Sequence, residues 1–137
     1  MLYSILIYVA EDRVSAMTQE EDDDHIARHM QLHEKLAAQG KLGPVVRLMP
    51  TTTAVQVRTA DEPPVIVDGP FAETKEQLLG FYMVDCESLE EAIAIARSLP
   101  SVNSVFEIRP VKLYFPDRGV ILNSQQASDP RAKKPLA

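Results

Sequence analysis

The chain has 137 residues, of which 45% are hydrophobic and 25% are charged, and its formal net charge at pH 7 is −6. A chain of this length and composition is expected to fold as one soluble globular domain with a single core. The acidic balance argues against non-specific binding to nucleic acid or to an anionic membrane, because both attract a basic face. The single cysteine, Cys86, excludes an intramolecular disulfide, and the first residues lack the features of a signal peptide or a membrane span. We therefore expect a cytoplasmic protein.

The first part of the chain predicts a strand, a long helix and further strands. Residues 2–10 alternate with apolar side chains on both faces, which indicates a strand covered on both sides. Thr18 and Glu21 have the spacing of a capping box, and they predict a helix that runs to about Gln39 and ends at Gly40. Strands are predicted over residues 42–48, 52–59 and 79–86, with a short apolar run at 65–68.

The second part predicts another helix and a closing strand. Ser88 and Glu91 repeat the capping-box spacing, and an apolar stripe follows until Pro100 ends the helix. The last strand is predicted over residues 104–113, and residues 114–137 form a C-terminal extension whose last dozen residues we expect to be mobile. This order predicts an α+β fold of the ferredoxin-like, split βαβ type, with an antiparallel sheet and two helices on one face.

The other face of such a sheet is uncovered in a monomer. We assign to it large apolar side chains from three strands: Leu6, Tyr8, Tyr82, Val84, Phe106 and Ile108. An open apolar face of this size is typical of an association surface. We therefore expect a homodimer with its sheets face to face, which is a dimeric α/β barrel.

Three histidines lie at i, i+4 and i+8 on the first long helix, namely His25, His29 and His33. This spacing places them in one row along the helix. Such a row can chelate a metal, but no cysteine pair or HExxH pattern accompanies it, and we expect no metal and no cofactor. Either His29 moves a proton near a carboxylate, or the histidines are hydrogen-bonded residues of the core.

The segment from Asp68 to Tyr82 reads DGPFAETKEQLLGFY. Its first three residues form a turn by their own chemistry, but turn geometry does not require the charged string that follows. The whole segment resembles the signature of DGPF-domain proteins, a group within the YCII-related family. The resemblance covers residues 1–113 and implies the same ferredoxin-like fold and dimeric barrel.

The resemblance also implies a candidate site. A histidine of the first helix and an aspartate are the suggested catalytic pair of the family, and His29 and Asp68 occupy these places here. One hypothesis is an enzyme that uses this pair for proton transfer on a small polar organic acid or lactone. The alternative is a non-catalytic module, linked to sigma-factor-associated regulation, that binds a small molecule or a transcription-related partner. Its binding residues would be Asp68, Gly69, Pro70, Phe71, Glu73 and Lys75.

Overall fold

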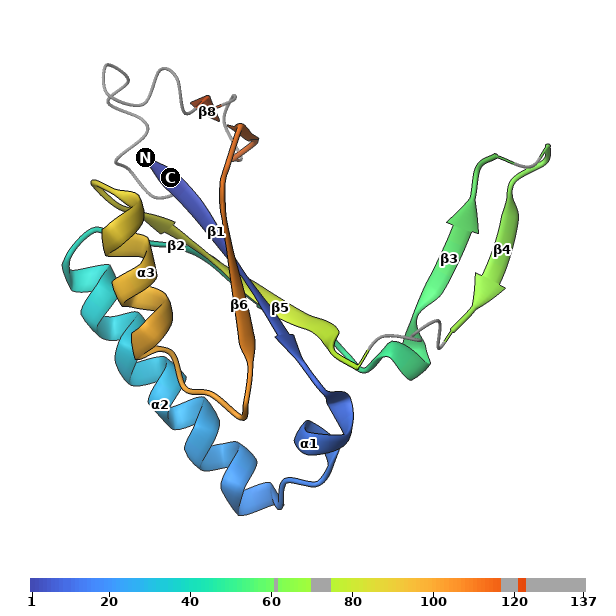
Figure 1. The fold of residues 1–137 in the computed structure, drawn as a ribbon, viewed down its shortest axis with the longest axis horizontal. Helices are drawn as coiled ribbons and strands as arrows, with labels where there is room; N and C mark the ends of the chain where they lie inside the picture. The colour runs from blue at the N-terminus through green and yellow to red at the C-terminus, as the bar shows by residue number, and fades with distance from the viewer. Residues whose placement is uncertain (61, 70–74, 117–120, 123–137) are drawn as a thin grey trace.

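The computed structural model describes residues 1–60, 62–69, 75–116 and 121–122 (Figure 1). Its main elements are a four-stranded sheet, three α-helices and a separate hairpin. In chain order, the elements are β1 (Leu2–Val9), α1 (Glu11–Ser15), α2 (Gln19–Ala38), β2 (Leu42–Arg47), the 3-10 turn η1 (Thr51–Thr53), β3 (Val55–Arg58), β4 (Val65–Asp68), β5 (Gln77–Asp85), α3 (Leu89–Ser98), β6 (Val105–Pro110), β7 (Leu113–Tyr114) and β8 (Ile121–Leu122).

The four-stranded sheet has the order β2-β5-β1-β6, and all its neighbouring strands are antiparallel. The helices α2 and α3 pack on one of its faces, as Figure 1 shows. This arrangement confirms the predicted α+β class with an antiparallel sheet, and it is consistent with the ferredoxin-like fold. The hairpin β3–β4 is inserted between the second and third strands of the sheet.

The two long helices begin where their capping residues predict. The Oγ1 of Thr18 accepts a hydrogen bond from the amide of Glu21 at 3.1 Å, and the carboxylate of Glu21 accepts one from the amide of Thr18 at 3.4 Å. α2 then stops before Gly40, which takes a φ of +69° that few other residues adopt. At α3 the hydroxyl of Ser88 accepts from the amide of Glu91. The short helix α1 has no counterpart in the sequence prediction.

The core lies between the sheet and the two helices. β1 contributes Tyr3, Ile5 and Ile7 to this core, and β5 contributes Tyr82 and Val84. The helices contribute Leu36 of α2 and four residues of α3 and its C-cap, namely Ala92, Ile95, Ala96 and Leu99. Ile7 lies opposite Gly80 of β5 and Phe106 of β6, and Phe106 packs against the same core. The core therefore covers the helix-facing side of β1 from Tyr3 to Ile7.

The prediction for the open face was wrong for four residues. Tyr82 and Val84 are core residues, and Phe106 and Ile108 pack against the same core. The reason is the strand register, since directly opposed residues share a face. Tyr82 and Ile108 both lie opposite Ile5, which points to the helices. The alternation within each strand could not show that these four residues face the helices.

On the open face, Leu6 has Phe81 on one side and Glu107 on the other. A second small cluster forms around Leu2 and Met83, and residues after β6 contribute Val111 and Tyr114 to its edge. Glu107 and Arg109 both lie on this face as an exposed pair, with 3.9 Å between guanidinium and carboxylate. The open face therefore combines an apolar centre with charged residues on β6.

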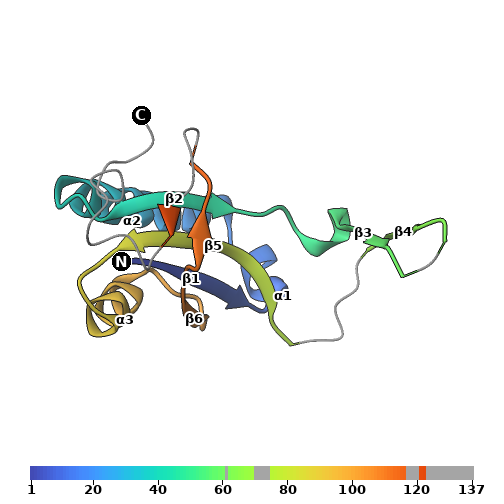
Figure 2. The same cartoon turned by 90° about the horizontal axis from the view of Figure 1, so that it is seen from above.

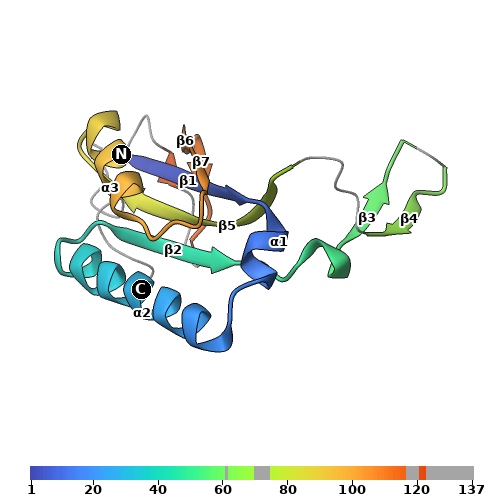
Figure 3. The same cartoon turned by 60° about the horizontal axis from the view of Figure 1, so that its bottom comes forward.

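The β3–β4 hairpin extends away from the body of the molecule (Figures 1, 2 and 3). The carboxylate of Glu11 accepts hydrogen bonds from the amide of Thr51 at 2.7 Å and from its hydroxyl at 2.6 Å. The amide of Glu11 donates to the side chain of Gln77 at 3.0 Å. These contacts hold the root of the hairpin, and residues 51–53 are a 3-10 turn rather than the start of the predicted strand.

One face of the hairpin carries three exposed apolar side chains. Val57 pairs directly with Ile66, and Val55 lies on the same side because it is two residues before Val57. Their exposed fractions are 54% for Val55, 59% for Val57 and 69% for Ile66.

Among the described residues, none of the helices is both long and apolar enough to cross a membrane.

Candidate functional site

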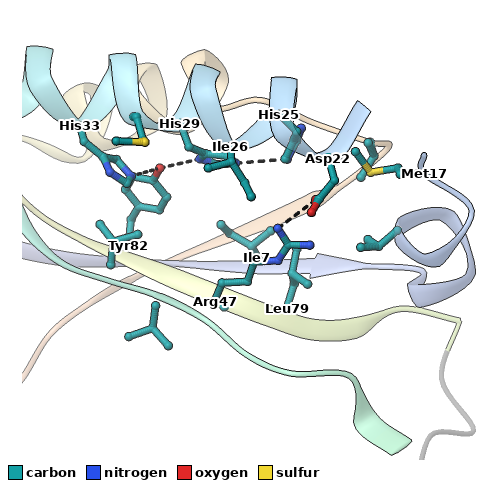
Figure 4. Close-up of a pocket in the computed structure, with 16 residues that line it drawn as sticks. Ile7, Met17, Asp22, His25, Ile26, His29, His33, Arg47, Leu79 and Tyr82 are labelled. Atoms are coloured by element: carbon teal, nitrogen blue, oxygen red, sulfur yellow. Dashed lines mark hydrogen bonds and ion pairs between the residues drawn. The ribbon is translucent and has the colours of Figure 1, made fainter. Parts of the chain in front are cut away.

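A pocket lies between α2 and the helix-facing side of the sheet (Figure 4). Its volume is about 300 Å³, and most of its lining is aliphatic or thioether side chains such as Ile7, Met17, Ile26, Val45 and Leu79. The polar lining residues are Asp22, His25, His29, His33, Arg47 and Tyr82. We call this cavity the histidine pocket. An apolar cavity with a few convergent polar groups is the usual form of a small-molecule site.

The three histidines form a row that Tyr82 joins from β5. The Nδ1 of His29 lies 2.6 Å from the Tyr82 hydroxyl oxygen, and the Nε2 of His33 lies 2.6 Å from the same oxygen. The Nε2 of His29 lies 3.2 Å from the Nε2 of His25. The helix supplies this geometry, because residues four apart project from the same side. The structure therefore brings together the three histidines that the spacing placed in one row.

The environment of the row keeps its imidazoles neutral. Burial, the neighbouring His25 and His33, and then Arg47 lower the pKa of His29 to about 4. Burial lowers the pKa of His33, and burial together with Arg47 lowers the pKa of His25. Burial raises the pKa of the Tyr82 hydroxyl, which therefore keeps its proton. At neutral pH the row consists of uncharged groups that can both donate and accept protons.

Sequence reasoning missed two charged residues at this pocket. The guanidinium of Arg47, at the end of β2, lies 3.1 Å from the carboxylate of Asp22, and both line the pocket. Asp22 was hidden in an acidic run that its place at the start of α2 already explained, although it precedes His25 by three residues and so lies on the same side of the helix. Arg47 gave no sequence signal, because only strand pairing brings β2 beside the row.

Asp68 lies elsewhere. It is an exposed residue at the end of β4, where it pairs with Val55, and it does not line the histidine pocket. The structure thus does not bring Asp68 to His29 within one chain, and the catalytic pairing of these two residues stays a prediction. Gly69 donates its amide hydrogen to the Ala54 carbonyl at 2.6 Å. The predicted binding residues Pro70, Phe71 and Glu73 lie outside the described residues.

Lys75 lines a second cavity, which we call the polar cleft. This open cleft has a volume of about 740 Å³ and lies at the root of the hairpin, with Glu11, Arg13, Thr51 and Gln77 among its lining residues. Lys75 itself is exposed. The described site residues therefore fall in three places: His29 in the histidine pocket, Asp68 and Gly69 at the end of β4, and Lys75 at the polar cleft.

The described part of the chain contains neither a cluster of metal ligands nor an exposed thiol. Within it, no group of three or more histidine, cysteine, aspartate or glutamate side chains is arranged to hold a metal ion. Cys86 is buried, and burial beside Glu91 raises the pKa of its thiol to about 11. The thiol is therefore protonated at neutral pH, as expected of a core cysteine.

These observations define a small α+β protein with a pocket between its first long helix and its sheet. The family model for the YCII-related domain matches residues 1–114, and the chain belongs to this family. A protein of Rhizobium meliloti (strain 1021), described as uncharacterized, is 47% identical over 119 residues. That match covers 85% of the present chain and 96% of the relative.

Proposed function

We propose that the histidine pocket binds a small organic acid or lactone with an apolar body, and that the histidine row, with His29 at its centre, takes up a proton from it. The observation that carries this proposal is the neutral imidazole of His29, held by Tyr82 in a largely apolar cavity. A neutral imidazole in such a place can act as a general base. The apolar lining narrows the substrate class, since it favours a ligand with few polar groups.

An acidic ligand suits the charges of the pocket. Arg47 uses one guanidinium nitrogen toward Asp22, and a guanidinium has five N–H donors, so that donors remain for a carboxylate. A carboxylate bound there would also raise the pKa of His29, because a nearby negative charge favours the protonated ring. The ligand would then bring the weak base closer to the pH at which it has to work.

Binding and proton transfer can be tested separately. Benzoate and hexanoate, titrated into ¹⁵N-labelled protein, should shift the amide signals of Ile7, Val45 and Leu79. The substitution Arg47→Gln should weaken the binding of both acids. The matched control is Arg28→Gln, because Arg28 is also an arginine paired with an aspartate, but it and its exposed partner Asp24 do not line the pocket. Unchanged amide signals with every acid tested would refute the binding proposal.

Proton transfer is followed in D₂O with a panel of small lactones and cyclic acids. The expected result is replacement of an α-hydrogen by deuterium, seen as loss of its ¹H signal. His29→Gln should abolish the exchange and leave ligand binding in place. Exchange at the parent rate in His29→Gln would show that His29 takes no part in the proton transfer.

The exposed face of the β3–β4 hairpin favours a second role, which is contact with a second copy of the chain. An isolated two-stranded hairpin is marginally stable in water, and Val55, Val57 and Ile66 leave an apolar surface on this one. We propose a homodimer in which this surface and the open sheet face are covered. A dimeric barrel is the arrangement that the family resemblance implies.

The test of the homodimer is sedimentation at micromolar concentration. The parent should sediment as a dimer and Val57→Asp as a monomer. Gln56→Asp is the matched control, since Gln56 lies on the opposite face of the hairpin. A monomeric parent would refute the dimer.

A further inference from the structure

The hydrogen bonds of the histidine row form one unbranched chain through four side chains. The contacts run from His25 Nε2 to His29 Nε2, from His29 Nδ1 to the Tyr82 hydroxyl, and from that hydroxyl to His33 Nε2. Each contact needs one hydrogen, and a neutral imidazole has one N–H while tyrosine has one O–H. The direction of one hydrogen bond therefore fixes the direction of the other two.

Only two proton orders satisfy all three contacts. In the first, His25 donates to His29, His29 donates through its Nδ1 to Tyr82, and Tyr82 donates to His33. In the second, His33 donates to Tyr82, Tyr82 donates to the Nδ1 of His29, and His29 donates through its Nε2 to His25. In the first order His33 carries its own hydrogen on Nδ1, and in the second His25 does.

We propose that these four side chains are a proton relay that runs along the histidine pocket from His25 to His33, with Tyr82 as the link between His29 and His33. The inference deepens the proposed function and rests on it for the source of the proton. Starting from the first order, the ligand's proton binds the free Nδ1 of His25. One proton then moves across each of the three hydrogen bonds, and the proton on Nδ1 of His33 leaves. Every group is neutral before and after, and the relay is left in the second order.

The geometry supports this direction of transfer. Figure 4 shows Met17, Asp22 and Arg47 toward the His25 end of the row, so that the guanidinium proposed to bind the ligand's carboxylate lies at that end. His33 is eight residues further along α2, which corresponds to about 12 Å. Both contacts of the Tyr82 hydroxyl are short, at 2.6 Å. A relay explains why the Tyr82 hydroxyl contacts both His29 and His33, whereas His29 acting alone as the base would not need this tyrosine.

The relay predicts that a change at His25 reaches His33 although the two rings do not touch. His25→Lys places a group that only donates beside His29, and His25→Glu places one that only accepts when ionised. The protein is labelled with ¹⁵N-histidine, and the side-chain nitrogen shifts are recorded at about pH 8.5, where lysine is still charged. His33 should carry its hydrogen on Nδ1 in His25→Lys and on Nε2 in His25→Glu, with a severalfold difference in tautomer ratio.

Two further variants separate the relay from a simple effect of charge. Asp24→Asn also changes the helix by one positive charge, but Asp24 is exposed and paired with Arg28, and this variant should leave the His33 tautomer at the parent ratio. Tyr82→Phe, added to both His25 variants, should abolish the difference between them. The same His33 tautomer in His25→Lys and His25→Glu would overturn the relay, as would a difference that persists without the Tyr82 hydroxyl.

Failure of the relay and failure of the proposed function are distinguishable. Benzoate binding is scored on backbone amides of the pocket, whereas the relay is scored on the tautomer of His33 in the absence of any ligand. Coupling between His25 and His33 supports the relay whether or not benzoate binds. Benzoate binding without that coupling would leave a binding pocket whose histidines do not pass protons to each other.

Discussion

His29 couples the stability of the fold to pH. An imidazole in the unfolded chain has a pKa near 6.5, whereas the folded environment lowers the pKa of His29 to about 4. Between these two values the unfolded state binds more protons than the folded state, so stability rises with pH. The contribution of His29 is therefore fully present above about pH 6.5 and is lost as the pH falls toward about 4.

The size of this effect follows from the same two pKa values. Each pKa unit corresponds to about 1.36 kcal/mol, so the depression to about 4 corresponds to about 3 kcal/mol. The ring of His29 is only partly buried, and water at its edge screens part of the penalty of charging it. We therefore expect about 2 kcal/mol of folding free energy to depend on this one residue.

Urea unfolding at several pH values between neutral and about 4.5 measures the effect. Over this range the free energy of unfolding should fall by about 2 kcal/mol more in the parent protein than in His29→Gln, since glutamine does not titrate. Glu34→Gln is the control, because Glu34 is an exposed residue of the same helix. Parallel loss of stability in the parent and in His29→Gln would refute the reasoning, and so would a titration of His29 itself near its ordinary pKa.

Three further predictions concern the framework of the site. Gly80→Ala should lower the melting temperature clearly, because a Cβ at this position would collide with the backbone of Val46, and such overpacking costs about 1–3 kcal/mol; an unchanged melting temperature would contradict this packing. Thr18→Ala should cost about 1 kcal/mol in urea unfolding through loss of the cap on α2, whereas Thr18→Ser should retain it. Cys86 should resist iodoacetamide in the native protein and react after denaturation, since its thiol is buried and its pKa is raised to about 11; rapid native labelling would disprove its burial.

Local chemistry made much of the fold predictable. The caps at Thr18 and Ser88 located the starts of the two long helices, and Gly40 located the end of the first. These signals act within one helical turn, so they can be recognised without knowing the rest of the structure. The spacing of His25, His29 and His33 was informative for the same reason.

Long-range pairing made the remaining features unpredictable. The position of Tyr82 under the histidine row depends on the register of β5 against β1, and a change of register by one residue would turn it to the other face. Arg47 reaches the pocket only because β2 pairs with β5. Asp68 was assigned to His29 by resemblance, but the hairpin that contains it leaves the body of the fold. Sequence spacing thus located the histidines of α2, but it did not identify Asp22 on the same helix or the lining residues of the sheet.

The place of β1 within the sheet has a consequence for synthesis of the chain. β1 is made before the other strands, yet both of its neighbours, β5 and β6, begin only at Gln77 and Val105. While the first half of the chain emerges from the ribosome, β1 has no neighbouring strand to pair with. The apolar side chains of β1 therefore stay exposed until β5 and β6 have been synthesised. Distant pairing of this kind slows folding and leaves unpaired strand edges open to aggregation. The nascent protein is therefore most vulnerable before β5 and β6 are complete.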